Sequence, residues 1–227
     1  MIFLFDKEGN ILWSKEAKLD VRAVAITEDG NYLFFGSNEI TQGDLPYKTF
    51  LVPHFNAYNI NGERLWSQKN VNPANFISIS SNGEYIAVAG YFLFNIDGEL
   101  LWTHYGSATT SRIAIDKKGR YIVADVGEYR FPFFIFHNIY VFDREGKILW
   151  KYRSGDTIIS VGISDDRRFV TFADRGLDMF FFDNFKTIEE YKEGMGEEKR
   201  LGLSHELIIV FIIGILIYLR IIKRGMK

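Results

Sequence analysis

Short apolar runs recur along most of the chain, and small polar turns separate them. Val24–Ile26 and Tyr32–Phe35, for example, flank the turn Thr27–Gly30. Short runs rich in β-branched and aromatic residues, bounded by Asn, Asp, Ser and Gly, predict strands joined by hairpin turns. The pattern therefore predicts an all-β chain of short antiparallel strands.

Two kinds of turn repeat at a fixed distance. The first is an Asx-x-x-Gly turn followed by Leu-Trp, and it contains every tryptophan of the chain: Gly9 with Trp13, Gly62 with Trp66, Gly98 with Trp102 and Gly146 with Trp150. The second lies 21 residues further on, at Gly30, Gly83, Gly119 and Arg167. Asx, Ser or Thr at the first position caps such a turn, and Gly three residues later closes it in a left-handed conformation. The constant spacing over four copies indicates a repeat array.

Each repeat consists of strand a, a turn, strand b, a connection, strand c, a second turn and strand d with its Trp. Four short antiparallel strands in roughly 40 residues are typical of a β-propeller blade. We predict propeller repeats over residues 1–185: a c–d half-blade at 1–16 and blades at about 21–69, 74–105, 110–153 and, in degenerate form, 157–191. Unrelated hairpins in a β-sandwich would need neither the fixed offset nor the Trp.

The Asp-x-x-Gly-x-x-Leu-Trp phrase resembles the tryptophan-docking repeat of quinoprotein-like propellers, the pyrroloquinoline-quinone type. Ile77–Val88 resembles the a–b hairpin of WD-repeat propellers, and the layout is similar to that of archaeal surface proteins with many such repeats and a C-terminal membrane helix. The resemblance covers about residues 1–183. It implies that Trp13, Trp66, Trp102 and Trp150 pack between blades, and it leaves the function open because the architecture hosts unrelated activities.

The repeats add up to about four and a half blades. The chain opens on strands c and d, and the fourth blade has a doubtful strand d, because Asp183–Lys186 lacks the turn Gly and no Trp follows. Closing the ring with the N-terminal c–d hairpin and the C-terminal a–b hairpin would leave Leu177–Asp183 as an apolar edge, which proteins normally avoid. We therefore predict an open or incomplete ring, whose missing blades come from a longer reading frame or from a second copy.

The connection between strands b and c varies in length. It is long at about residues 37–54 and 126–137, and the alternating strand direction puts both insertions on one face. Variable loops on a constant scaffold often carry binding, and Tyr, Phe and Arg are favoured anchors. The candidate ligand-binding or partner-binding residues are Tyr47, Lys48, Phe50, Tyr129, Arg130 and Phe131. In the alternative interpretation, strands b and c are simply longer, and Phe131–Phe136 packs against the neighbouring blade.

Other chemistry is sparse. The chain has no cysteine, which excludes disulfides and thiolate sites, and its net charge of −2 without a basic stripe argues against nucleic acid. Its histidines are isolated and lack metal spacing and a repeated carboxylate at hand, so we interpret them as packed or surface residues: His54, His104, His137 and His205. Turn capping explains the turn acids without calcium. We expect no cofactor, no metal and no enzymatic activity.

The C-terminal region differs in character. A charged linker spans 189–203, and Leu207–Leu219 contains no charge, which predicts a transmembrane helix at 204–222 and a basic tail at 223–227. The apolar segment is short, about 24 Å for 207–222 against a core of roughly 30 Å, and Arg220 can extend it by snorkelling. Two alternatives to a spanning helix fit less well. A helix buried in the protein would need a partner layer, which the propeller does not offer, and an interfacial helix would need a polar face, which this segment lacks.

The sequence is compatible with two orientations of the chain in the membrane. The basic cluster after residue 219 favours a cytoplasmic C-terminus with the propeller outside. Lys199 and Arg200 on the other side, and an N-terminus that does not read as a signal peptide, favour a tail-anchored cytosolic propeller. We expect a membrane-anchored, non-enzymatic binding or scaffold propeller with a protein or glycan partner. The alternatives are part of a quinone-dependent oxidoreductase or hydrolase, and a cytosolic assembly platform.

Overall fold

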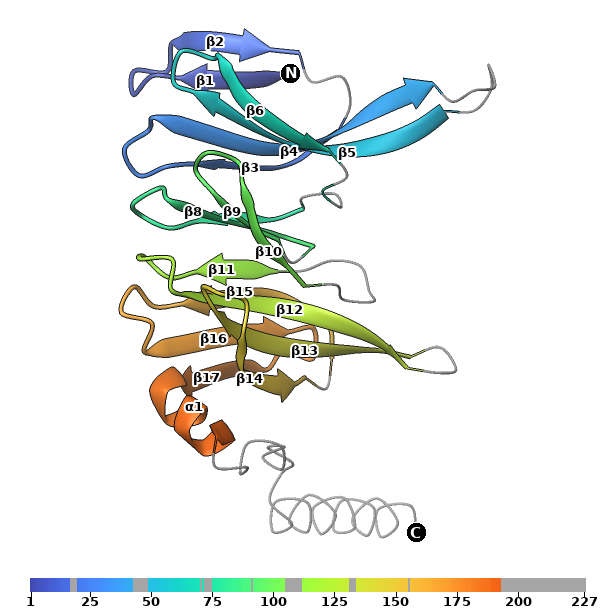
Figure 1. Cartoon of the computed structure of the whole chain (residues 1–227), viewed down its shortest axis with the longest axis vertical. Coiled ribbons are helices and arrows are strands. Elements are labelled where there is room, and N and C mark those ends of the chain that lie inside the picture. The colour runs from blue at the N-terminus through green and yellow to red at the C-terminus, as the bar shows by residue number, and fades with distance from the viewer. Residues whose placement is uncertain are drawn as a thin grey trace, which may run out of the picture.

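The chain is a stack of small antiparallel sheets. The computed structural model describes residues 1–16, 20–42, 49–69, 71, 75–90, 92–104, 112–130, 134–154 and 156–192. A two-stranded half-blade comes first, with β1 (Ile2–Phe5) and β2 (Ile11–Lys15). Three four-stranded sheets and one three-stranded sheet follow in chain order, and Figure 1 shows them layered from the N-terminus to helix α1 (Asn184–Lys192).

In each of these sheets, strands that are adjacent in the chain are adjacent in space. Blade 1 consists of β3 (Val21–Ile26), β4 (Tyr32–Gln42), β5 (Thr49–Asn59) and β6 (Arg64–Lys69). Blade 2 consists of β7 (Ile77–Ile79), β8 (Tyr85–Val88), β9 (Phe92–Asn95) and β10 (Leu100–Thr103). Blade 3 consists of β11 (Ile113–Ile115), β12 (Tyr121–Arg130), β13 (Phe134–Asp143) and β14 (Ile148–Arg153). Blade 4 consists of β15 (Ile158–Ile163), β16 (Phe169–Asp174) and β17 (Met179–Asp183). These are the a–b–c–d meanders of propeller blades, and blade 4 has strands a, b and c within the described residues.

The repeated turns adopt the conformation that their sequence requires. Gly62 has φ +79° and its N–H donates to the carbonyl oxygen of Asn59 at 3.0 Å. Arg167 takes the corresponding a–b turn position of blade 4 with φ +62°, a region that non-glycine residues seldom occupy. Its guanidinium lies 5.2 Å from the ring centre of Tyr121 in blade 3, a cation–π contact that helps to offset the backbone strain.

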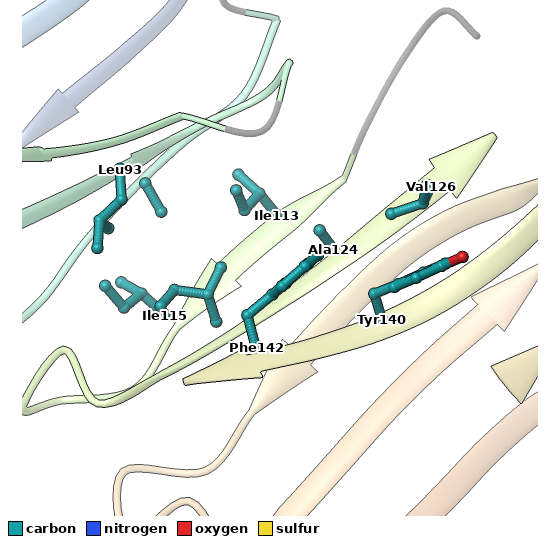
Figure 2. Packing of buried hydrophobic residues seen from close by; sticks show 9 residues of the cluster. Leu93, Ile113, Ile115, Ala124, Val126, Tyr140 and Phe142 are labelled. Atoms are coloured by element: carbon teal, nitrogen blue, oxygen red, sulfur yellow. The ribbon is translucent and has the colours of Figure 1, made fainter. Parts of the chain in front are cut away.

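Apolar residues from facing sheets interdigitate between the blades. Between blades 2 and 3, Ala87 and Leu93 meet Ile113, Ile115 and Phe142, as Figure 2 shows for the labelled residues. Equivalent clusters lie between blades 1 and 2 and between blades 3 and 4. Fully burying one such side chain stabilises the fold by about 1.5–3 kcal/mol, so these interfaces are the core of the molecule.

The b–c insertions continue strands rather than forming separate loops. β4 and β5 stay paired from Tyr32 with Asn59 out to Gln42 with Thr49, and β12 and β13 stay paired out to Arg130 with Phe134. Both hairpins project from the same side of the stack in Figure 1, as the alternating strand direction predicts. We call this end of the blades the hairpin face, and the opposite end, which carries the a–b and c–d turns, the turn face.

The array is open. No strand pairing joins the half-blade to blade 4 within the described ranges, so the four-bladed ring closed by β1–β2 and β15–β16 does not form. In Figure 1 the half-blade and blade 4 lie toward opposite ends of the stack. β17 is the last strand of its sheet, and Met179 and Phe181 on it are exposed.

A helix stands where the repeat calls for strand d. The sequence predicts a degenerate blade up to residue 191 and a charged linker from residue 189. In the structure, Asn184–Lys192 forms helix α1. Asp183 accounts for the difference. Its carboxylate accepts from the backbone N–H of Lys186 at 3.5 Å and its carbonyl from the hydroxyl of Thr187 at 2.9 Å, which begins a helix where a left-handed Gly would have closed a turn. Ile188 of α1 is buried in the cluster between blades 3 and 4.

The predicted linker beyond 192, the membrane helix at 204–222 and the basic tail lie outside the described residues. Within the part of the chain that the structure describes, no helix has the length and apolar character to cross a membrane.

Candidate binding face

The repeat tryptophans hold adjacent blades together. The indole N–H of Trp13 donates to the carbonyl of Ile60 at 2.8 Å, Trp66 donates to Ile96 at 2.9 Å, and Trp102 donates to Arg144 at 2.7 Å. Each acceptor is the second residue of the next c–d turn. The turn glycines Gly62, Gly98 and Gly146 lie under these indoles, where an added Cβ would come within 3.1, 2.6 and 2.9 Å of a ring atom.

The last tryptophan uses a different acceptor. Trp150 is buried, and its indole N–H donates to the side-chain oxygen of Asn184 at 2.5 Å. Asn184 occupies the second position of the degenerate turn, and its amide group donates in turn to the carbonyl of Arg167 at 2.9 Å. The Asn184 side chain therefore replaces a turn carbonyl where the chain becomes helical. Gly9, in the first turn of the chain, has nothing within 4 Å of an added Cβ.

The hairpins bring three of the six predicted binding residues to one end of the array. Phe50 lies in β5 opposite Thr41, Tyr129 lies in β12 opposite Ile135, and Arg130 lies opposite Phe134. These three positions are on two projections from one face. Tyr47, Lys48 and Phe131 lie outside the described residues.

A buried acid–histidine pair lies at the base of the β12–β13 hairpin. The Asp125 carboxylate is 3.0 and 3.3 Å from Nδ1 of His137, and Asp125 is 1% exposed. His137 is therefore not isolated, as the sequence analysis expected, but paired with a carboxylate. His137 sits opposite Gly127 in the ladder and Asp125 sits opposite Ile139, so both side chains point to the same side of the sheet.

Burial raises the pKa of Asp125 to about 6, while the hydrogen bond and charge of His137 and the charge of Arg112 oppose the rise. When Nδ1 of His137 carries the proton and donates to Asp125, Nε2 keeps its lone pair and can accept a proton or a hydrogen bond. The pair can thus orient a polar group or exchange a proton.

The other side of the same hairpin carries a second polar group. The hydroxyl of Tyr140 donates to the Glu128 carboxylate, and the ring of His104 lies 5.9 Å from that of Tyr140 and 5.3 Å from that of Phe142. Burial lowers the pKa of His104, and the charge of Glu128 opposes this. Titratable groups therefore flank the β12–β13 hairpin on both sides.

The corresponding hairpin of blade 1 carries hydroxyl and amide contacts at its base. His54 Nδ1 is 3.3 Å from the hydroxyl of Ser67, and the Asn56 amide donates to the hydroxyl of Ser37 at 3.2 Å. The two hairpins therefore share a backbone design and differ in the polar residues at their bases.

A signal for Asp125 was present in the repeat itself. Counted six residues after the a–b turn, the other blades have Gly36, Ala89 and Ala173 where blade 3 has Asp125. A carboxylate at a position that otherwise holds a small residue indicates a special role. A strand-by-strand alignment of the repeats identifies Asp125, whereas metal-binding and catalytic-triad motifs do not include it.

Two further observations concern metal ligands and cavities. No group of three or more His, Cys, Asp or Glu residues that could hold a metal ion occurs in the described ranges. A cavity of about 360 Å³ lies away from the hairpins, between β14, β17 and α1, and its walls include Trp150, Tyr152 and Tyr191. This cavity lies at the C-terminal end of the array.

Comparison with known proteins supports the fold. No protein-family model matches the sequence, and no curated protein sequence matches it either. The β-propeller domain of the Trilobed protease from Pyrococcus furiosus, described as having an open velcro topology, superimposes with a TM-score of 0.50 at 13% identity, over 74% of this chain and 56% of that one. TolB from Acinetobacter baumannii gives 0.46 at 14% identity, over 78% and 44%.

This chain spans a little over half the length of the protease propeller chain. The open sheets and the four-stranded meanders, together with this likeness, define the chain as a β-propeller repeat array. At this level of identity the likeness concerns the fold alone.

Proposed function

We propose that this β-propeller is a non-enzymatic scaffold that binds a macromolecular partner through its hairpin face. The observation that carries the proposal is the pair of extended b–c hairpins, which project from one face of an otherwise uniform array. Blades repeat for stability, whereas extended connections on one face serve recognition.

The partner class follows from the amino acids of the two long b–c connections. The first connection contains Tyr47, Lys48 and Phe50, the second contains Tyr129, Arg130 and Phe131, and both combine aromatic side chains with a positive charge. Aromatic and Arg anchors are enriched where proteins bind proteins, and their charge fits an acidic surface. We therefore favour a protein partner over a glycan.

The proposal includes an anchor. The apolar segment within 204–222 would hold the array at a membrane, and the basic residues after it would keep the C-terminus cytoplasmic and the propeller outside. In sealed cells, added protease should then digest the propeller. Full protection of the propeller in intact cells, with digestion only after lysis, would favour the tail-anchored cytosolic platform instead.

Site-directed photo-crosslinking tests the binding face. A photoreactive phenylalanine analogue replaces Tyr47 or Tyr129 in the full chain, and matched variants carry it at Asn61 or Glu145, which are exposed on the turn face. We expect a discrete crosslinked partner from the two hairpin positions and none from the turn positions. Equal crosslinking from both faces, or none from the hairpins, contradicts the proposal.

An enzyme is the second candidate, and the buried Asp125–His137 pair favours it. A histidine held by a carboxylate on Nδ1 is the arrangement of many general bases, and the compared propeller belongs to a protease. This reading predicts turnover of a peptide or ester, or of a sugar or alcohol with saturable quinone binding. Asp125→Asn and His137→Gln should abolish that turnover. Absence of turnover across these panels supports the scaffold.

A further inference from the structure

Each blade has, just before strand a, a residue whose carbonyl accepts a backbone hydrogen bond from the end of strand b. In blades 1 to 4 this residue is Asp20, Phe76, Arg112 and Thr157, and the N···O distances are 3.2, 2.8, 2.9 and 2.8 Å. The position belongs to the hairpin face, because strand d of one blade ends there and strand a of the next begins there. Its four side chains are acidic, aromatic, basic and hydroxyl-bearing, so the repeat itself does not require an arginine in blade 3.

The guanidinium of Arg112 is held in place by both neighbouring blades. Its Nε–H donates to the carbonyl of Ile159 in blade 4 at 2.7 Å, and its Cζ lies 4.0 Å from the centre of the Phe76 ring in blade 2. Strands a of neighbouring blades contact each other, so these contacts lie at the strand-a edge of the array. A guanidinium that is stacked on a ring and fixed through Nε loses little further freedom when its two Nη groups bind a ligand.

The two Nη groups of Arg112 are available to a ligand. Arg112 is half-buried, and within the described ranges no protein acceptor lies in hydrogen-bond reach of either Nη group. Asp125 lies opposite Arg112 where the β11–β12 pairing continues, so the two side chains share one side of the sheet. Both carboxylate oxygens of Asp125 are directed at Nδ1 of His137, at 3.0 and 3.3 Å. Burial raises the pKa of Asp125, and the charge of Arg112 opposes the rise.

The surroundings of Arg112 select a carboxylate among the anions. A guanidinium binds a carboxylate or a phosphate through two parallel N–H···O bonds. Asp125 on the same side of the sheet repels an incoming anion when it is ionised, and this repulsion is larger for a phosphate, which carries up to two charges, than for a carboxylate. The side chain of Ile159, whose carbonyl fixes Nε, is 46% exposed and offers apolar surface to the methylene groups of an Asp or Glu.

We propose that Arg112 binds the carboxylate of an Asp or Glu side chain in an acidic segment of the partner protein. The inference rests on the proposed function, since the segment belongs to the partner that the hairpin face binds. The two long b–c connections supply aromatic and basic residues for that face. Arg112 adds a fixed point at the strand-a edge, where one acidic residue of the partner is recognised by two parallel hydrogen bonds.

Chemical modification measures whether a carboxylate covers Arg112. Phenylglyoxal reacts with accessible guanidinium groups, and peptide mass spectrometry of the full chain in detergent follows Arg112 together with the exposed Arg64 of β6 as the internal control. At constant ionic strength, a hexapeptide of alternating Glu and Leu should slow the modification of Arg112 by about tenfold at saturation and leave Arg64 unchanged. Sodium acetate should give the same protection only at a higher concentration.

The other outcomes of this experiment contradict the inference. No protection of Arg112, or equal protection of Arg64, would show that Arg112 is no specific site. Acetate that protects as well as the peptide at equal concentration would identify a small free carboxylate as the ligand instead of a partner segment. Inorganic phosphate that protects better than acetate would contradict the choice of a carboxylate.

Crosslinking in cells connects the site to the partner. The photoreactive analogue at Tyr129 is combined with Arg112→Gln, and with Arg64→Gln as the matched control. We expect the yield of the crosslinked partner to fall about tenfold or more with Arg112→Gln and to stay unchanged with Arg64→Gln. Arg112→Lys, which keeps the charge without the planar fork, should lower the yield by a smaller factor and covers the case in which Gln disturbs the contact with Ile159.

The result separates the two proposals. An unchanged yield in both Arg112 variants overturns the inference, while the crosslink itself still supports the proposed function. Absence of any crosslink from the unsubstituted hairpin face contradicts the proposed function, and the protection of Arg112 from phenylglyoxal then decides the inference.

Discussion

Trp66 in blade 1 lies directly against Gly98 in blade 2, so closely that a Cβ added at Gly98 would come within 2.6 Å of the indole. The same indole donates to the carbonyl of Ile96 at 2.9 Å. One side chain thus fixes both the distance between two blades and the position of a turn. The same relationship joins Trp13 to Gly62 and Trp102 to Gly146, and it holds neighbouring repeats together without closure into a ring.

Substituting the docked glycine should cost more than substituting an undocked one. Gly98→Ala meets both the positive φ of +84° and the indole of Trp66, so we expect a loss of about 2–4 kcal/mol in the free energy of unfolding. Gly9→Ala has a similar φ of +89° and open space, so it isolates the backbone strain, about 1 kcal/mol. Urea denaturation measures both, and equal losses would contradict the docking.

The Trp150–Asn184 hydrogen bond should couple blade 3 to α1. Trp150→Phe leaves the oxygen of a fully buried Asn184 without its indole donor, which should cost about 1–3 kcal/mol. Asn184→Ala removes the acceptor and the contact with Arg167 as well. A double-mutant cycle with both changes should show a coupling of at least about 0.5 kcal/mol. Strictly additive losses would contradict a hydrogen bond between these two side chains in the folded protein.

The Asp125–His137 pair predicts a pH dependence of stability. Because the pKa of Asp125 rises from its ordinary 3.8 to about 6 on folding, the folded state binds this proton more tightly than the unfolded chain does. Raising the pH from about 4 to about 6 should therefore reduce the free energy of unfolding by about 2 kcal/mol.

Asp125→Asn, which keeps the shape of the side chain, should remove that slope, and its stability should be compared with the wild type at pH 4, 5, 6 and 7. If the wild type and Asp125→Asn show parallel pH profiles, the carboxyl group is not held in the buried site described.

The C-terminal segment predicts the solubility of the chain. Deleting residues 201–227 removes the uncharged Leu207–Leu219 run and leaves every described strand in place. We expect a protein that needs detergent to become soluble, with an unchanged β-rich circular dichroism spectrum. A truncated chain that still sediments with membranes would mean that the propeller itself binds lipid.

Much of the fold was predictable because its determinants are local. The turn at Gly62 and the Trp66 that follows it specify a hairpin and a docking residue within one short segment, and their constant spacing reveals the repeat. Helix α1 was missed, since Asp183 reads equally as the start of a degenerate turn and as a helix cap. Whether the turn or the helix forms depends on the burial of Ile188 between blades 3 and 4.

The candidate site was less predictable because it is non-local. Asp125 and His137 meet only when the register of β12 and β13 is known, and a shift of one residue would send them to opposite sides of the sheet. The long b–c connections were recognised from their lengths alone, and the binding residues on them stay a prediction. What they bind depends on side chains that the repeat pattern does not constrain.

The distance between the two ends of the array tests the open-propeller account most directly. The chain has no cysteine, so Phe3→Cys in β1 and Thr171→Cys in β16 can be spin-labelled without further changes, and pulsed electron resonance reports their separation. Three complete blades lie between these strands, and facing sheets pack about 10 Å apart, so we predict a distance well above about 20 Å. A distance near the roughly 5 Å spacing of paired strands, broadened only by the labels, would show a closed four-bladed ring and contradict the account.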